Sequence, residues 1–392
     1  MIGLLAILHA LIDATSVSRV FSSIRGLSPG TMTFWILIYN LLAFAPQVFL
    51  GAAADLFAGR ERRQTAKRLS AGPYSSNVYM AAAMSGALLV FAGAVISMPM
   101  QAGICLVALG NSLFHVGGGG YTLHNSKGRA AWAGVFVGPG SLGLALGTLF
   151  PRNVYFYAAA LGGLAVCAAL LFAADIRKKN AAASGQLVTD GAEPDVPSLK
   201  GNGAGDLSLK ALTPKILVAG VCLLCLAVVF RAFGGSFPAF TWKTGAVMAL
   251  TATLFIMAGK MSGGFAYDRV GPAKTIIASI VIAGPLIAFF PDQSVPSLIG
   301  LFCLNLSMPV TLVLLYRFLP RYPAFAFGLA ASSLMPGTMF GDLLKSGSWH
   351  LTGMSRNLLF IGCSIIALAC VLIAIHWKAI TSNRRKEELS DV

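Results

Sequence analysis

Two ionisable residues stand four positions apart near the start of the chain, inside an otherwise apolar run. His9 and Asp13 fall on one face of a helix, and Ser16 extends the same stripe. An imidazole and a carboxylate at this spacing can exchange a proton. If the helix crosses a membrane, His9 lies about 13 Å along its axis from Met1, at a depth where ionisable groups are costly and usually functional. We predict a proton-coupling pair, with a structural hydrogen bond as the alternative.

Two arginines occupy matching places in the two halves of the chain. Arg19 begins the sequence Arg-Val-Phe-Ser-Ser, and Arg231 begins Arg-Ala-Phe-Gly-Gly. Two guanidinium groups facing one chamber would suit a phosphate, phosphonate or carboxylate through bidentate hydrogen bonds. The alternative is that both side chains extend toward water from the outer ends of their helices. Lys260 has the same two interpretations, cavity or snorkelling.

A second charged stripe lies late in the chain. Thr338, Asp342 and Lys345 share one helical face, where the carboxylate can neutralise the ammonium group. We expect either a salt bridge that breaks during a functional cycle, with Asp342 and Lys345 as substrate-binding candidates, or a static interface pair.

Asn111 and His115 complete the set of substrate-binding candidates. They precede four consecutive glycines, Gly117 to Gly120. No Lys-Ser/Thr follows these glycines and no strand precedes them, so a phosphate-binding loop is not indicated. Close approach of another helix is the better interpretation.

The composition requires a lipid environment for these groups. Hydrophobic residues make up 56% of the 392 positions and charged residues only 11%, and the mean hydropathy is +0.77. A membrane span takes about 20 apolar residues. We predict an all-α integral membrane protein with twelve spans: Ile2–Phe21, Thr31–Ala54, Val78–Met98, Gln101–Tyr121, Ala130–Phe150, Val154–Ala173, Ile216–Phe237, Gly245–Gly264, Thr275–Phe290, Val295–Leu319, Phe325–Ser346 and Asn357–Trp377.

The spans divide into two sets of six. We predict a first six-helix bundle over 1–174 and a second over 214–380. Residues 175–213 between them lack apolar periodicity and are rich in Ala, Gly, Ser and Pro, which predicts an exposed cytoplasmic linker. Residues 381–392 form a charged cytoplasmic tail.

Basic residues indicate the orientation. Most of the 29 Lys and Arg fall in the loops after even-numbered spans and in the tail. Because such residues gather in cytoplasmic loops, both termini should lie on the cytoplasmic side of a bacterial cytoplasmic membrane. The net charge of +15 is spread over six separate segments, so nucleic-acid binding is the weaker interpretation.

Enzymatic function is not indicated. The sequence contains no His-Glu-x-x-His motif and no recognisable nucleophile with its base. All seven cysteines lie inside apolar spans, so no disulfide framework is expected. Cys222 and Cys225 match a metal-binding spacing but have no acidic or histidine companions nearby. We therefore expect no metal and no cofactor.

An internal repeat supports the division into halves. Gly51 and Asp55 end the second span, and Gly264, Asp268 and Arg269 end the eighth at a nearly equal offset. The two arginine sequences recur at almost the same spacing. Duplicated halves of this kind are common in transporters.

At these residues the chain resembles the major facilitator superfamily, whose motif Gly-x-x-x-Asp-(Arg/Lys)-x-Gly-x-(Arg/Lys) follows spans 2 and 8. The second copy fits, but the first has Leu56 in place of a basic residue. The resemblance implies two pseudo-symmetric bundles around a central cavity. It also implies that Gly51, Asp55, Gly264, Asp268 and Arg269 act in gating.

A Gly-Pro-rich segment from Gly134 to Gly143 looks like the motif of antiporters in that superfamily. Phe114-His115, together with His9-x-x-x-Asp13, is similar to the fosmidomycin-resistance exporters, although Val116 replaces an expected proline. These likenesses imply proton-coupled export of a small organic anion by a monomeric carrier in contact with lipid. A proton-symport importer of a small metabolite and a lipid flippase remain alternatives.

Overall fold

The computed structural model describes residues 1–68, 77–151, 153–183, 214–346 and 353–390. Within these ranges the chain is helical with short connections, and no strand is present. Twelve stretches are long and apolar enough to cross a membrane. They agree with the predicted spans to within a few residues at most ends, which confirms the predicted all-α membrane architecture.

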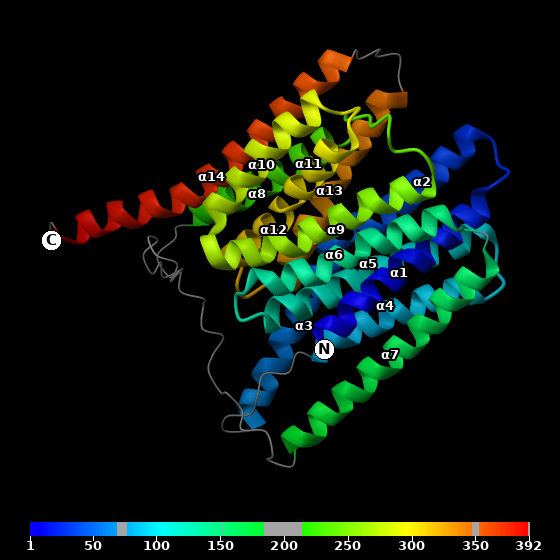
Figure 1. Cartoon of the computed structure of the whole chain (residues 1–392). Helices are drawn as coiled ribbons and strands as arrows, with labels where there is room; N and C mark the ends of the chain where they lie inside the picture. The colour runs from blue at the N-terminus through cyan, green and yellow to red at the C-terminus, as the bar shows by residue number, and fades with distance from the viewer. Residues whose placement is uncertain (69–76, 152, 184–213, 347–352, 391–392) are drawn as a thin grey trace.

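The first half of the chain contributes seven helices that form six spans (Figure 1). These are α1 (Ile2–Ile24), α2 (Pro29–Phe44), α3 (Gln47–Arg68), α4 (Asn77–Val95), α5 (Met100–Asn125), α6 (Ala130–Leu149) and α7 (Val154–Ala183).

The second half repeats this pattern. Its helices are α8 (Pro214–Gly235), α9 (Gly245–Val270), α10 (Pro272–Phe289), α11 (Ser294–Asn305), α12 (Ser307–Phe318), α13 (Pro323–Ser346) and α14 (Gly353–Ser390). Figure 1 shows α7 and α14 on opposite outer edges of the molecule.

Prolines account for the two spans that are broken into pairs of helices. Pro46 has no N–H to offer the carbonyl one turn earlier, and the second span divides there into α2 and α3. Pro309 cannot donate to the carbonyl of Asn305, where α11 ends and α12 takes over. Each half therefore reaches six spans with seven helices.

Two helical segments extend beyond the predicted boundaries. α7 continues to Ala183, so the predicted linker 175–213 begins inside a helix, and residues 184–213 lie outside the described part. α14 continues to Ser390 through most of the predicted tail. The domain boundaries themselves stay predictions.

The most extensive contacts between the halves are made by two helix pairs. α6 of the first half packs on α9 of the second, and α3 packs on α13. Small residues allow the approach: a Cβ added to Gly134 would lie 2.6 Å from the Lys260 carbonyl oxygen, and one added to Gly51 would lie 2.5 Å from that of Ala324. The two pairs occupy corresponding places in the two halves, since α3 and α9 contribute to spans 2 and 8, and α6 and α13 form spans 5 and 11.

Candidate functional site

Four polar side chains of the first half meet around one carboxylate. Asp13 Oδ2 lies 3.3 Å from His9 Nε2, and Asp13 Oδ1 lies 3.8 Å from His115 Nε2. Asn111 Nδ2 donates to Asp13 Oδ1 at 2.8 Å. The predicted pair His9–Asp13 is thus joined by Asn111 and His115, which the sequence placed only among separate substrate-binding candidates. We refer to these four residues as the Asp13 cluster.

Helix geometry explains how the cluster forms. His9 and Asp13 are one turn apart on α1, and Asn111 and His115 are one turn apart on α5. His115 Nδ1 bonds the Asn111 carbonyl oxygen at 2.8 Å, and His9 Nδ1 bonds the Phe136 carbonyl oxygen of α6 at 2.7 Å. The two rings meet edge to face, with centroids 4.4 Å apart. Both imidazoles are therefore fixed through one nitrogen and point the other at Asp13.

Glycines of α6 create the space for this arrangement. A Cβ on Gly140 would collide with His9 Nε2 and would lie 2.8 Å from Asp13 Oδ2. A Cβ on Gly143 would lie 2.7 Å from the Ala10 carbonyl carbon. The Gly-Pro segment that the sequence associated with antiport thus lets α6 lie directly against the ionisable face of α1.

The Asp13 cluster is deeply buried, and three of its residues could bind one cation together. The side chains of His9, Asp13 and His115 are 5%, 12% and 12% exposed. One ligand atom from each lies within 4.8 Å of the others, which makes the group a possible metal-binding set. This grouping could not be predicted from ligand spacing in the sequence, because His115 lies on another helix, about 100 residues after His9 and Asp13.

An aromatic residue of the second half covers the cluster. The Phe327 ring of α13 lies 6.5 Å from the His115 ring and 5.8 Å from the Phe136 ring, centroid to centroid. Phe114 and Phe136 flank His9 from within the first half. The cluster therefore lies on the face of the first bundle that meets the second.

Cationic side chains of the second half approach this same boundary. Arg231 on α8 is half-buried, and its Nε is fully enclosed without a hydrogen-bond partner. Lys260 on α9 interacts electrostatically with both Arg231 and Asp13. Among the described side chains neither cation forms an ion pair. Two unpaired cations near one another favour binding of an anion.

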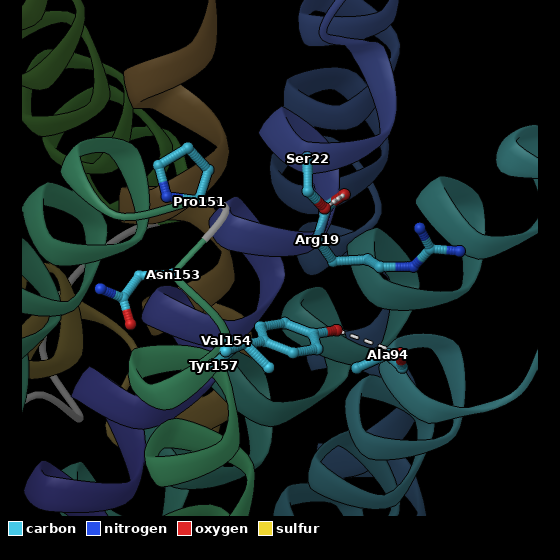
Figure 2. Close-up of a pocket in the computed structure, with 7 residues that line it drawn as sticks. All are labelled: Arg19, Ser22, Ala94, Pro151, Asn153, Val154 and Tyr157. Atoms are coloured by element: carbon cyan, nitrogen blue, oxygen red, sulfur yellow. Dashed lines mark hydrogen bonds between the residues drawn. The ribbon is translucent and has the colours of Figure 1, made fainter.

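Arg19 lies elsewhere. Its Nε donates to the Gly93 carbonyl oxygen of α4 at 3.2 Å, and its guanidinium also donates to Ser23 Oγ at 2.5 Å. It lines a pocket of about 210 Å³ together with Tyr157, whose hydroxyl donates to the Ala94 carbonyl oxygen (Figure 2). Every described contact of Arg19 is with the first bundle, so the expected facing pair of Arg19 and Arg231 is absent from this conformation.

The stripe on α13 is described only in part. Thr338 donates to the Leu334 and Met335 carbonyl oxygens of its own helix, at 3.2 and 3.0 Å. The side chains of Asp342 and Lys345 lie outside the described part of the chain. Their proposed salt bridge stays a prediction.

The first motif carboxylate binds the start of a helix in the opposite half. Asp55 accepts hydrogen bonds from the backbone N–H groups of Ala324 at 3.2 Å and Phe325 at 2.8 Å, and from the Tyr79 hydroxyl at 2.7 Å. The first turn of a helix presents unpaired N–H groups and a partial positive charge, which a carboxylate satisfies. Asp55 is 5% exposed.

The second motif carboxylate makes the reciprocal contact. Asp268 accepts from the N–H groups of Ala130 at 2.7 Å and Ala131 at 3.0 Å, at the start of α6. Asp268 is exposed, unlike Asp55, and so is the neighbouring Arg269. We call these two interactions the Asp55 clamp and the Asp268 clamp. Each span runs in the opposite direction to the one before it, so spans 2 and 8 both end on the side where α1 begins. Both clamps therefore lie at that end of the molecule.

Comparisons with known proteins bear on the fold. No known family profile matches the sequence, and no curated protein matches it either. Solved structures do match, and three of them match over 94% of this chain and 98% of their own. They include FucP, a major facilitator superfamily transporter in the outward conformation (TM-score 0.53, 11% identity), and the human organic anion transporter MFSD10 (TM-score 0.61, 11% identity). A second structure of FucP, described as the E. coli fucose:proton symporter, has a TM-score of 0.52 and 12% identity.

Proposed function

From its major facilitator fold, we propose that this chain is a secondary active transporter that moves a small solute across a membrane by alternating access. The observation that carries the proposal is the Asp13 cluster: four polar side chains buried on the face that one bundle presents to the other. Buried ionisable groups at membrane depth are costly, and transporters retain them to bind solutes or coupling ions.

The coupling ion is proposed to be the proton. Two imidazoles and one carboxylate meet with their hydrogen-bonding atoms 3.3 and 3.8 Å apart, so one proton can be shared among them. Asn111 orients the carboxylate through its amide. Lys260 and Tyr39 also interact electrostatically with Asp13. Movement of the Phe327 ring away from the His115 and Phe136 rings would expose this proton site.

The solute is proposed to be a small organic anion such as a phosphonate, a phosphate ester or a carboxylate. Arg231 and Lys260 supply two cations that lack partners among the described side chains. MFSD10, described as an organic anion transporter, supports the same class. Arg19 is left out of the binding site in this conformation, because its guanidinium is already bonded to Gly93 and Ser23.

The gate is proposed to be the pair of clamps. Gly51 and Gly264 allow α3 and α9 to lie against the opposite half, and the Asp55 and Asp268 carboxylates then bind the starts of α13 and α6. Opening at this end requires both contacts to break. Arg269 is exposed beside Asp268, and we propose that it interacts with the start of α6 during opening.

Export by proton antiport in a bacterial cytoplasmic membrane is the proposed direction, with both termini inside and a monomeric protein. The second candidate is proton symport into the cell, which is favoured by the likeness to FucP, a structure described as a fucose:proton symporter. Both candidates use the Asp13 cluster. They differ in whether the proton and the solute cross the membrane in opposite directions or together.

The test uses the purified full-length protein reconstituted into vesicles that contain a pH-sensitive dye. Fosmidomycin, a hexose phosphate, a simple carboxylate and neutral fucose are added in turn, with the pH gradient imposed in each direction. An anion that drives proton movement supports the proposal, and the sign of that movement separates antiport from symport.

Three variants complete this test. His9→Gln and Asp13→Asn should abolish gradient-driven movement and leave solute exchange partly active. Normal coupling in both would remove the proposed role of the cluster. Arg231→Gln should weaken anionic solutes more than neutral ones, and equal losses would exclude charge recognition at that site.

A further inference from the structure

The Asp13 cluster has the donor set of a transition-metal site. His9 Nε2 and His115 Nε2 flank the two oxygens of one carboxylate at 3.3 and 3.8 Å. Ligands about 2.0–2.2 Å from a tetrahedral zinc ion are roughly 3.3–3.6 Å from each other. The three residues already lie close to that spacing, with one ligand atom of each within 4.8 Å of the others.

The hydrogen bonds fix which imidazole nitrogens are free. Both Nδ1 atoms bond main-chain carbonyl oxygens, His9 to Phe136 and His115 to Asn111. A carbonyl only accepts, so each Nδ1 carries a hydrogen and each neutral ring leaves a lone pair on Nε2. Those lone pairs face a carboxylate that also only accepts. The arrangement is unfavourable unless a proton or a metal ion lies between them.

The surroundings resemble the outer shell of a metal centre. Histidine ligands commonly donate a hydrogen bond from the second ring nitrogen to a backbone carbonyl oxygen, as His9 and His115 do here. Carboxylate ligands commonly accept a hydrogen bond, as Asp13 does from Asn111. The rings of Phe114 and Phe136 shield His9 from polar competitors. Gly140 leaves open the space where a Cβ would meet His9 Nε2 and Asp13 Oδ2.

We propose that His9, Asp13 and His115 bind one divalent first-row transition-metal ion of the Zn²⁺, Co²⁺ or Ni²⁺ class. Imidazole nitrogens select these ions, whereas Mg²⁺ and Ca²⁺ prefer oxygen ligands. Three protein ligands leave a position open for water or an anion. The ion and the coupling proton need the same Nε2 lone pairs, so a bound metal stops the coupled cycle. This last consequence rests on the proposed function, but metal binding itself does not.

Binding is tested on the full-length protein in detergent, stripped with a chelator and titrated with Co²⁺. Visible absorption reports Co²⁺ in a low-symmetry protein site, and equilibrium dialysis gives the stoichiometry. We expect one ion per chain, displaced by Zn²⁺ but not by Mg²⁺. His9→Gln and His115→Gln should each weaken binding at least ~100-fold, and Asn111→Leu about 10- to 100-fold, the range for outer-shell partners.

Controls identify the ligands. His376→Gln removes a histidine whose Nδ1 bonds the Leu372 carbonyl oxygen on α14, and the double variant Cys222→Ser, Cys225→Ser removes the Cys-x-x-Cys spacing. Both should bind Co²⁺ as the unchanged chain does. Gly140→Ala keeps every ligand but places a methyl group against His9 Nε2 and Asp13 Oδ2, so it should lose binding even if a histidine variant fails to fold.

Three results would overturn the proposal: no Co²⁺ bound by the unchanged protein, unchanged affinity in the His9, His115 and Gly140 variants, or loss of the site in the cysteine double variant. Proton-coupled transport without metal binding would exclude the metal site and keep the proposed function. Metal binding without any proton coupling would do the reverse.

Discussion

Asp55 Oδ2 lies 2.8 Å from the backbone nitrogen of Phe325, although the two residues are 270 positions apart in the chain. The contact joins the end of a span in the first half to the start of a helix in the second. Asp268 makes the corresponding bond to Ala130 in the opposite sense. The repeated motif of the sequence is therefore a reciprocal bond between the halves.

Breaking the Asp55 clamp should loosen the start of α13. In Asp55→Asn one oxygen becomes an N–H donor, which faces the N–H of Phe325 or Ala324 and cannot bond it. A hydrogen bond to a charged group contributes about 1.5–3 kcal/mol, so local opening should rise about 10-fold or more. Hydrogen exchange of the peptide containing Ala324 and Phe325 measures this.

Asp268→Asn is the matched comparison. It should raise exchange at Ala130 and Ala131 by a smaller factor, because Asp268 is exposed and water competes for its partners. Equal effects of the two variants, or exchange that changes only in the half carrying the substitution, would contradict this assignment of the clamps.

Gly51→Ala should disfavour the closed arrangement at the same end. The new Cβ would lie 2.5 Å from the Ala324 carbonyl oxygen and 2.9 Å from Phe325 Cα, both main-chain atoms that cannot rotate away. We expect faster exchange at the start of α13 and a changed transport rate. Gly59→Ala on the same helix meets nothing within 4 Å and should behave as the unchanged chain does. Indistinguishable behaviour of the two variants would show that the helices have room to spare.

The two arginines of the repeat should have different effects when replaced. Arg19→Gln removes the bonds to Gly93 and Ser23 inside the first bundle. It should lower the free energy of unfolding by about 1.5–3 kcal/mol, the range for a hydrogen bond to a charged group, and leave the preference for anions intact. Arg231→Gln, whose Nε has no partner, should cost less stability and reduce that preference. Thermal unfolding in detergent and transport of an anion against a neutral solute separate the two. The reverse pattern would restore Arg19 to the substrate site.

Phe327→Ala should open the Asp13 cluster to reagents from the interface. The ring lies between the second bundle and the His115 and Phe136 rings, so its removal leaves a gap above His115. Modification of His115 by diethyl pyrocarbonate, followed by mass spectrometry, should become several-fold faster. Phe289→Ala provides the control, because that ring is 64% exposed at the end of α10. An unchanged rate in Phe327→Ala would mean that another group seals the cluster.

The amino-acid sequence determined the membrane architecture by itself. Surplus apolar residues fix the number of spans, since each must cross a hydrocarbon core of set thickness, and this information is local. The pair His9 and Asp13 was equally local, because residues one helical turn apart must share a face. The repeat also marked Asp55 and Asp268 as equivalent residues.

Only the tertiary structure decided what these residues contact. The packing of α1 against α5 and α6 brought His115 and Asn111 to Asp13, and it depends on close approach at Gly140 and Gly143. The matching sequence positions of Arg19 and Arg231 could not show that one guanidinium bonds within its own bundle and that the other lacks a partner. Side-chain direction and helix crossing depend on contacts between segments far apart in the chain, and no periodicity within one segment contains them.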